Sequence, residues 1–311
     1  MEDLIMKHGR ERILKAAASA VALSVLLGTP FGVSAADAEP LRIATKPMTE
    51  QYILGEMLKL VIENNTDYTC EITKGIGGGT SNIMPAMEKG EFDLYPEYTS
   101  SGYVLVLGHD AKGVPDNEMW EQLLQEYHDT YGMTWIAHYG FNNTYCITVS
   151  GEAARKYNLK TCSDMAAVSD QLIFGGNPDY IEREDGFPAV CSTYGCQFKE
   201  VKSIDIGLKY AALMNGEIDV TNGYTTDAQL GVQDVVALED DKHLQVNYFC
   251  STVVREDTLD SHPGLSDALM LMDNILSDTE MAKLNARVET DGLDEAEAAK
   301  EYLVEKGILE G

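Results

Sequence analysis

Beyond residue 40 the spacing of apolar residues changes repeatedly between that of a strand and that of a helix. Residues 41–46 alternate apolar and polar positions, which predicts a half-buried strand. Thr49 is then expected to cap a helix, with Glu50 in its first turn, where the helix dipole favours an acid. That helix is expected to end at Asn64-Asn65 and to bury one apolar stripe. The stripe consists of Ile53, Leu54, Met57, Leu58, Val61 and Ile62.

The same alternation continues along the chain. A strand is expected at 68–73, followed by a glycine-rich turn at 75–80, a helix to Met87 and a strand at 92–95. The last stretch, 266–308, has helical spacing and an acidic surface. Strands and helices that alternate in this way predict an α/β fold with largely parallel sheets.

Two segments 126 residues apart resemble each other without a gap. Residues 86–99 and 212–225 share an alanine, a glycine, a glutamate, an aspartate, a tyrosine and a threonine, six of fourteen positions. Each copy consists of a helix end, a glycine, a short strand and then Tyr-Thr. The match is explained either by a common α/β connection or by two lobes of like architecture. Because ligands of open α/β sheets bind at strand ends, two such lobes would place Tyr98 and Tyr224 across one cleft.

The N-terminus has the layout of a secretory signal peptide, expected to span residues 1–35. Basic residues precede an apolar run at 16–27, and small residues follow at 33–35. An uncleaved anchor is the alternative, although Pro30 and several glycines make a poor spanning helix. No cysteine lies near the expected cleavage site, so the usual lipid attachment point is missing. The protein is therefore expected to be exported, to the periplasm or the cell surface.

The charge excludes one class of partner. The 311 residues include 51 acidic and 23 basic residues, a formal charge of −28. Nucleic acid is an improbable partner, because phosphate binding needs a basic face. The length suits two α/β lobes of ordinary size.

The chain lacks the familiar patterns of catalysis. The glycine run 75–79 has no Gly-Lys-Ser/Thr ending, so it is interpreted as a turn and not a phosphate loop. The histidines show no metal-ligand spacing, and no nucleophile elbow is present. We therefore expect a binding protein with no catalytic residues, no metal and no cofactor.

Six cysteines permit disulfides outside the cytoplasm. Cys191 and Cys196 form the one local candidate pair, since Gly195 would ease a tight loop. The hypothesis is that these two residues bond; the sequence leaves the remaining pairing open.

Seven stretches resemble the glycine betaine, carnitine and choline binding proteins of osmoprotectant ABC importers. Together they cover nearly the whole chain beyond the signal segment, in order. The resemblance implies a two-lobed periplasmic-binding-protein-like fold of type II, with two crossover strands and the ligand in the cleft between the lobes. Lobe I would comprise 40–141 and 250–311, and lobe II 142–249. The resembling stretches are 46–56, 78–80, 93–101, 140–145, 182–186, 202–210 and 253–259.

The same resemblance implies the site. An aromatic box maps onto Tyr98, Tyr145, Tyr224 and Tyr248, and the groups that hold a ligand carboxylate map onto Lys46, Arg183 and Ser101. A trimethylammonium group has no N–H, so tyrosine faces suit it better than hydrogen bonds do.

The implied ligand is a quaternary-ammonium osmoprotectant such as glycine betaine or carnitine, delivered by a monomeric protein to an ABC permease. Two alternatives stay open. One is a binding protein that prefers choline, and the other is a ligand-binding sensor module on the same fold.

Overall fold

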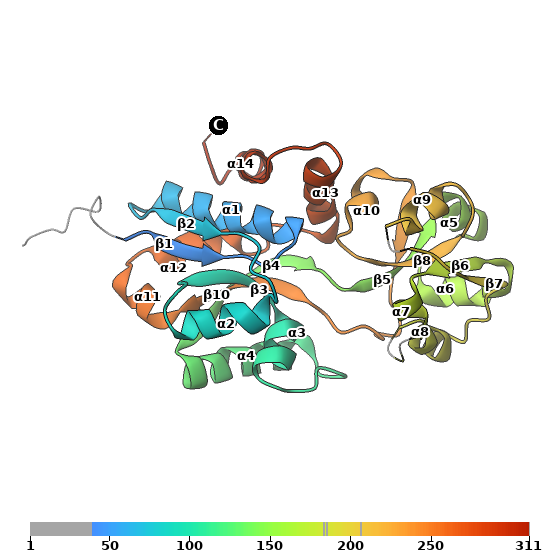
Figure 1. Ribbon diagram of the computed structural model, residues 1–311, viewed down its shortest axis with the longest axis horizontal. Helices are drawn as coiled ribbons and strands as arrows, with labels where there is room; N and C mark the ends of the chain where they lie inside the picture. Colours follow the sequence, from blue (N-terminus) through green and yellow to red (C-terminus); the bar gives the residue numbers. More distant parts are fainter. Residues whose placement is uncertain (1–38, 183, 185, 206, 311) are drawn as a thin grey trace, which may run out of the picture. The chain divides into compact units, whose positions relative to one another are not determined.

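The computed structural model describes residues 39–310, apart from 183, 185 and 206. The predicted signal peptide and Arg183 therefore lie outside the described residues. None of the helices among these described residues combines the length and the apolar composition that a membrane span requires. The strands fall into two five-stranded sheets, each covered by helices (Figure 1).

The first sheet has the strand order β2-β1-β3-β10-β4 and lies between two layers of helices. Figure 1 shows α1 along one face and α2 with α4 on the other. Its strands are β1 (Leu41–Ala44), β2 (Cys70–Thr73), β3 (Leu94–Tyr98), β4 (Met133–Asn142) and β10 (Phe249–Arg255). Its helices are α1 (Thr49–Asn65), α2 (Thr80–Glu88), α3 (Thr99–Ser101), the π-helical turn η2 (Gly102–Val106), α4 (Asp116–Tyr131), α11 (Glu256–Ser261), α12 (Leu265–Leu269), η4 (Met270–Met272), α13 (Asp278–Glu289) and α14 (Glu295–Glu305).

The second sheet has the order β7-β6-β8-β5-β9. Its strands are β5 (Tyr145–Ser150), β6 (Ile173–Gly176), β7 (Glu200–Ser203), β8 (Val220–Tyr224) and β9 (Val235–Leu238). The surrounding helices are α5 (Gly151–Tyr157), α6 (Cys162–Ala167), η3 (Ser169–Gln171), α7 (Pro178–Glu182), α8 (Phe187–Tyr194), α9 (Lys209–Met214) and α10 (Ala228–Val232).

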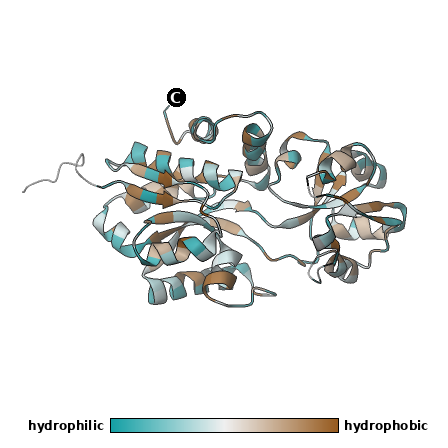
Figure 2. Ribbon diagram, viewed as in Figure 1, coloured by the Kyte–Doolittle hydropathy of each residue, from teal (hydrophilic) through white to brown (hydrophobic). Residues whose placement is uncertain are grey.

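The apolar stripe predicted on α1 is confirmed, since all six of its side chains are fully buried. They pack with the C-terminal helices α12, α13 and α14 in one cluster on the first sheet. A separate cluster covers the other face, and the second sheet has its own. Figure 2 shows hydrophobic residues both in the strands of the two sheets and on the helices that cover them. Burying such faces is the main favourable contribution to folding.

Two local predictions are wrong. Thr49 is the first residue of α1 and not its cap; Met48 occupies the cap position in an extended conformation, without a side-chain hydrogen bond. The sheets are not largely parallel. In each sheet two pairings are parallel, and the two made by the fourth strand, β10 or β5, are antiparallel. The reason lies in the connectivity, because β10 and β5 follow directly on segments that come from the other sheet.

The two sheets repeat one design. β3 has the third place in the first sheet, and β8 has the third place in the second. Each is parallel to one neighbour, β1 or β6, and antiparallel to the other, β10 or β5. Asp93 accepts a bond of 2.8 Å from the backbone N–H of Arg42, and Asp219 accepts one of 2.8 Å from that of Ile173. Gly90 and Gly216, which end the preceding helices, both have φ of 71°. The internal sequence match therefore reflects two lobes of like architecture.

The chain passes between the sheets twice. The first passage is residues 143–144, between β4 and β5, and the second is residues 239–248, between β9 and β10. The passages are tied together where the Thr144 hydroxyl donates to the Val246 carbonyl at 2.6 Å. The exact lobe limits given above stay a prediction.

All six cysteines lie within the described residues and are free thiols. The predicted bond between Cys191 and Cys196 is therefore absent. Gly195 does turn the chain as expected, with φ of 79°, and the two thiols meet. A hydrogen bond with Cys196, together with burial, raises the pKa of Cys191.

Gly140 in β4 is expected to be intolerant of a side chain. Its φ is 101°, and an added Cβ would lie 2.5 Å from the carbonyl oxygen of Leu276. We expect Gly140→Ala to cost roughly 1–3 kcal/mol from backbone strain, with the collision adding to it. Thermal unfolding would measure this as a fall in Tm of several degrees.

Gly113→Ala is the matched control. Gly113 also has a positive φ, 74°, but nothing lies within 4 Å of its added Cβ. Equal losses of stability in the two variants would show that the contact with Leu276 carries no cost.

Candidate functional site

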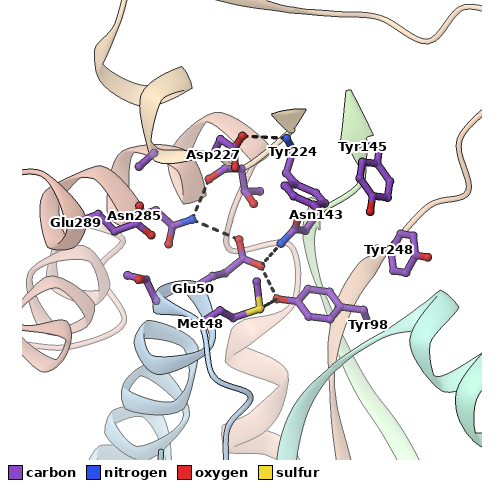
Figure 3. Close-up of a pocket in the computed structure, with 13 residues that line it drawn as sticks. Met48, Glu50, Tyr98, Asn143, Tyr145, Tyr224, Asp227, Tyr248, Asn285 and Glu289 are labelled. Carbon is purple, nitrogen blue, oxygen red and sulfur yellow. Dashed lines mark hydrogen bonds between the residues drawn. The ribbon is translucent and has the colours of Figure 1, made fainter. Parts of the chain in front are cut away.

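A pocket of about 410 Å³ opens between the two sheets (Figure 3). Its walls come from the starts of α1, β5 and α10, the ends of β3 and β8, the first passage, the residue before β10, and α13. The lining residues are Met48, Thr49, Glu50, Tyr98, Asn143, Tyr145, Tyr224, Thr226, Asp227, Ala228, Tyr248, Asn285 and Glu289.

All four tyrosines of the expected box line this one pocket. Tyr98 is the last residue of β3 and Tyr224 the last of β8, so the repeated Tyr-Thr sequence places one ring from each sheet. Tyr145 is paired with Tyr224 across the β5–β8 ladder, and their ring centroids are 4.7 Å apart. Tyr98 is buried, whereas Tyr224 is 37% exposed. The rings therefore range from the floor of the pocket to its mouth.

Lys46 lies outside the lining of the pocket. It is buried, and its ammonium forms an ion pair with the carboxylate of Glu97. The Lys46 nitrogen also lies 4.7 Å from the centroid of the Tyr98 ring, a cation–π distance. Glu97 accepts a further bond of 2.7 Å from the hydroxyl of Thr80. The charge of Lys46 is thus already balanced by a carboxylate of the protein.

Of the other two expected carboxylate-holding residues, Ser101 can be placed. It is the last residue of α3, half-buried, and is not among the lining residues. Arg183 lies outside the described residues.

The sequence interpretation missed the polar half of the pocket. Glu50 is 2% exposed and lies at its centre, where it accepts bonds from Tyr98 Oη at 2.5 Å and Asn143 Nδ2 at 2.9 Å (Figure 3). Asn285 Nδ2 lies 3.4 Å from its other oxygen. The only signal in the sequence was the place of Glu50 in a resembling stretch, where it was interpreted as a helix-dipole acid.

The surroundings of Glu50 act on its charge in opposite directions. Burial raises the pKa of Glu50 above its ordinary value, because a carboxylate loses hydration there. Hydrogen bonds, the one from Tyr98 foremost, oppose that rise.

The two other acids of the pocket are placed differently. Asp227 accepts a bond of 2.6 Å from the Tyr210 hydroxyl and lies 3.6 Å from the ammonium of Lys209. Glu289 is exposed at the end of α13. The lining thus contains three acids, and none of the described lining residues is a lysine or an arginine.

Aromatic faces and carboxylates together suit an organic cation. The negative faces of the rings attract a diffuse positive charge, and a low-dielectric setting strengthens that attraction. Across residues 39–310, with the three positions noted above set aside, no group of three or more His, Cys, Asp or Glu side chains is placed to hold a metal ion.

Comparison with known proteins agrees with this geometry. The described architecture is that of a two-lobed solute-binding protein. A solved structure described as a glycine betaine/carnitine/choline ABC transporter matches with a TM-score of 0.81 and 29% identity, over 86% of this chain and 99% of that one. Apo YehZ from Escherichia coli, at 24% identity and a TM-score of 0.77, shares the fold over 88% of this chain and all of its own.

The model of the substrate-binding domain of ABC-type glycine betaine transport systems matches residues 39–305, so the chain belongs to that family. The carnitine transport binding protein OpuCC of Listeria monocytogenes is 32% identical over 90% of this chain and 91% of its own length. The ergothioneine transport permease/ergothioneine binding protein EgtU of Helicobacter pylori is 36% identical over 93% of this chain. The chain spans about half of that relative's length, 52%.

Lys46→Met is expected to lower stability. It leaves the carboxylate of Glu97 buried without its cation, at a cost of about 3–5 kcal/mol in the free energy of unfolding. Urea titration measures this, and the double variant with Glu97→Gln should recover much of the loss.

Lys59→Met is the control, because Lys59 and Glu63 form a half-exposed surface pair at 4.0 Å. A change of less than about 0.5 kcal/mol is expected there. Lys46→Met could instead be as stable as the native protein and bind carboxylate-bearing ligands poorly. That result would show that Lys46 binds the ligand carboxylate and does not stabilise the fold through Glu97.

Proposed function

We propose that the protein is the exported binding subunit of an ABC importer and captures a quaternary-ammonium osmoprotectant of the glycine betaine or carnitine type. The observation that carries the proposal is that Tyr98, Tyr145, Tyr224 and Tyr248 line one pocket between the two sheets. The family membership and the carnitine-binding relative support it.

The physical basis is the match between a methylated cation and tyrosine rings. Each desolvated cation–π contact contributes up to about 2 kcal/mol. After the costs of association and ordering, a complex near −8 kcal/mol, or micromolar, is expected.

The proposed activity is ligand binding without catalysis. Lobe I (40–141 and 250–311) and lobe II (142–249) hinge about the two passages and close over the ligand, because both contribute tyrosines. A monomer in this closed form docks on a membrane permease, with no cofactor, and residues 1–35 direct export.

Ergothioneine is the second candidate ligand. It is a trimethylammonium betaine that also carries a thione ring with N–H donors. The carboxylate of Asp227 in the pocket offers an acceptor for such donors, and the Helicobacter pylori relative is named for this ligand. A volume of about 410 Å³ lies within the roughly 300–1,000 Å³ of pockets for drug-sized ligands, so a ring can fit.

Tyr224→Ala is expected to weaken binding of glycine betaine or carnitine at least about tenfold, through the loss of one cation–π contact. Folding should be retained, because the ring is 37% exposed. Isothermal titration calorimetry measures the affinity, and Tyr224→Phe is the control that keeps the ring. Unchanged affinity in Tyr224→Ala would count against the site.

A calorimetric panel of glycine betaine, carnitine, choline and ergothioneine separates the ligand candidates. We expect the native protein to bind at least one of the four at micromolar concentration or below. Ergothioneine binding at least about tenfold more tightly than the others would favour the second candidate. Binding of none of them would reject the proposed function.

A further inference from the structure

Glu50 differs from the other buried acids in its partners. Three carboxylates are buried among the described residues: Glu50, Asp93 and Glu97. Asp93 pairs with Arg42 at 2.7 Å, and Glu97 pairs with Lys46. None of the ion pairs found within the described part of the chain includes Glu50.

What holds Glu50 is a set of neutral donors from different parts of the fold. Tyr98 comes from the end of β3, Asn143 from the first passage and Asn285 from α13. Asn285 also donates to the carbonyl oxygen of Thr226, just beyond β8, at 2.9 Å. Neutral donors satisfy the oxygens of a carboxylate, but they leave its charge uncompensated.

A buried charge without a counter-ion is costly, and an opposite charge that enters the same cavity reduces that cost. Glu50 lines the pocket together with the four tyrosines. Tyr98, which forms part of the floor, donates a hydrogen bond from its hydroxyl to Glu50. A cation held by the rings therefore lies in the same pocket as this unbalanced carboxylate.

We propose that Glu50 is the counter-ion for the ligand's ammonium group, so that the site selects ligands by positive charge near Glu50 and holds any ligand carboxylate away from it. This inference rests on the proposed function and identifies a specificity-determining residue within the same pocket. It predicts that a bare cation depends on Glu50 more than a zwitterion does.

The proposal also couples binding to pH. A cation beside Glu50 favours the ionised carboxylate, so binding lowers the pKa that burial raises in the empty pocket. Protons are released on binding when the empty site is partly protonated. Affinity should therefore rise as the pH increases towards the pKa of the empty site, and level off above it. The titratable groups that face Glu50 or share its pocket are Tyr98, Tyr145, Tyr224, Asp227, Tyr248, Cys250 and Glu289.

The test compares Glu50→Gln with Glu289→Gln by calorimetry. Each variant removes one negative charge from the lining of the same pocket, one buried beside the rings and one exposed. The probes are tetramethylammonium, choline and glycine betaine. We expect Glu50→Gln to weaken tetramethylammonium and choline at least about tenfold and glycine betaine less, while Glu289→Gln changes each by no more than about threefold.

The second experiment measures the affinity of the native protein for tetramethylammonium as a function of pH. Tetramethylammonium has no group that titrates, so any change reports on the protein. The affinity should fall as the pH is lowered from about 8 to about 4, which takes it below the pKa that burial raises in Glu50, and Glu50→Gln should show a flatter profile. A urea titration of each variant confirms that it is folded.

The inference would be overturned, with the proposed function intact, if the two variants lost affinity for the probes equally. The same holds if the affinity of the native protein depended on pH as little as that of Glu50→Gln. A flat native profile overturns the inference even if Glu50→Gln does not fold. If the native protein bound none of the three probes nor any other quaternary ammonium compound, the proposed function itself would fail.

Discussion

The pocket depends on one constraint, which is that the third strand of each sheet ends in a tyrosine. Tyr98 and Tyr224 occupy equivalent places in two sheets of the same strand order. The backbone of each sheet, held by Asp93 or Asp219 at the opposite end of the strand, fixes where the ring emerges. A strand end is a rigid support, so a ring placed there can be part of a preorganised site.

The charged residues around the pocket differ in whether an opposite charge lies beside them. Behind Tyr98, Lys46 is neutralised by Glu97, and beside Tyr224, Asp227 lies near Lys209. Glu50 is left between them with neutral donors alone among the described residues. The described part of the pocket therefore presents π faces and uncompensated negative charge, and both attract the same kind of ligand.

Much of the fold could be predicted from the sequence because the decisive signals are local. The buried stripe of α1 follows from its spacing, and the Tyr-Thr repeat pointed to matching strand ends. The antiparallel strands β10 and β5 could not be predicted in this way, because their direction depends on passages between sheets. Glu50 was missed for a related reason, since its partner Asn285 lies 235 residues further along the chain. Likewise, the pairing of Lys46 spans 51 residues, to Glu97.

Rings from both sheets are proposed to surround one methylated cation. A crystal structure of the protein with a bound quaternary ammonium ligand would locate that cation. Its nitrogen is expected within about 6 Å of the ring centroids of Tyr98, Tyr145, Tyr224 and Tyr248. A nitrogen bound away from these rings, or contacted by the tyrosines of one sheet alone, would contradict the proposal.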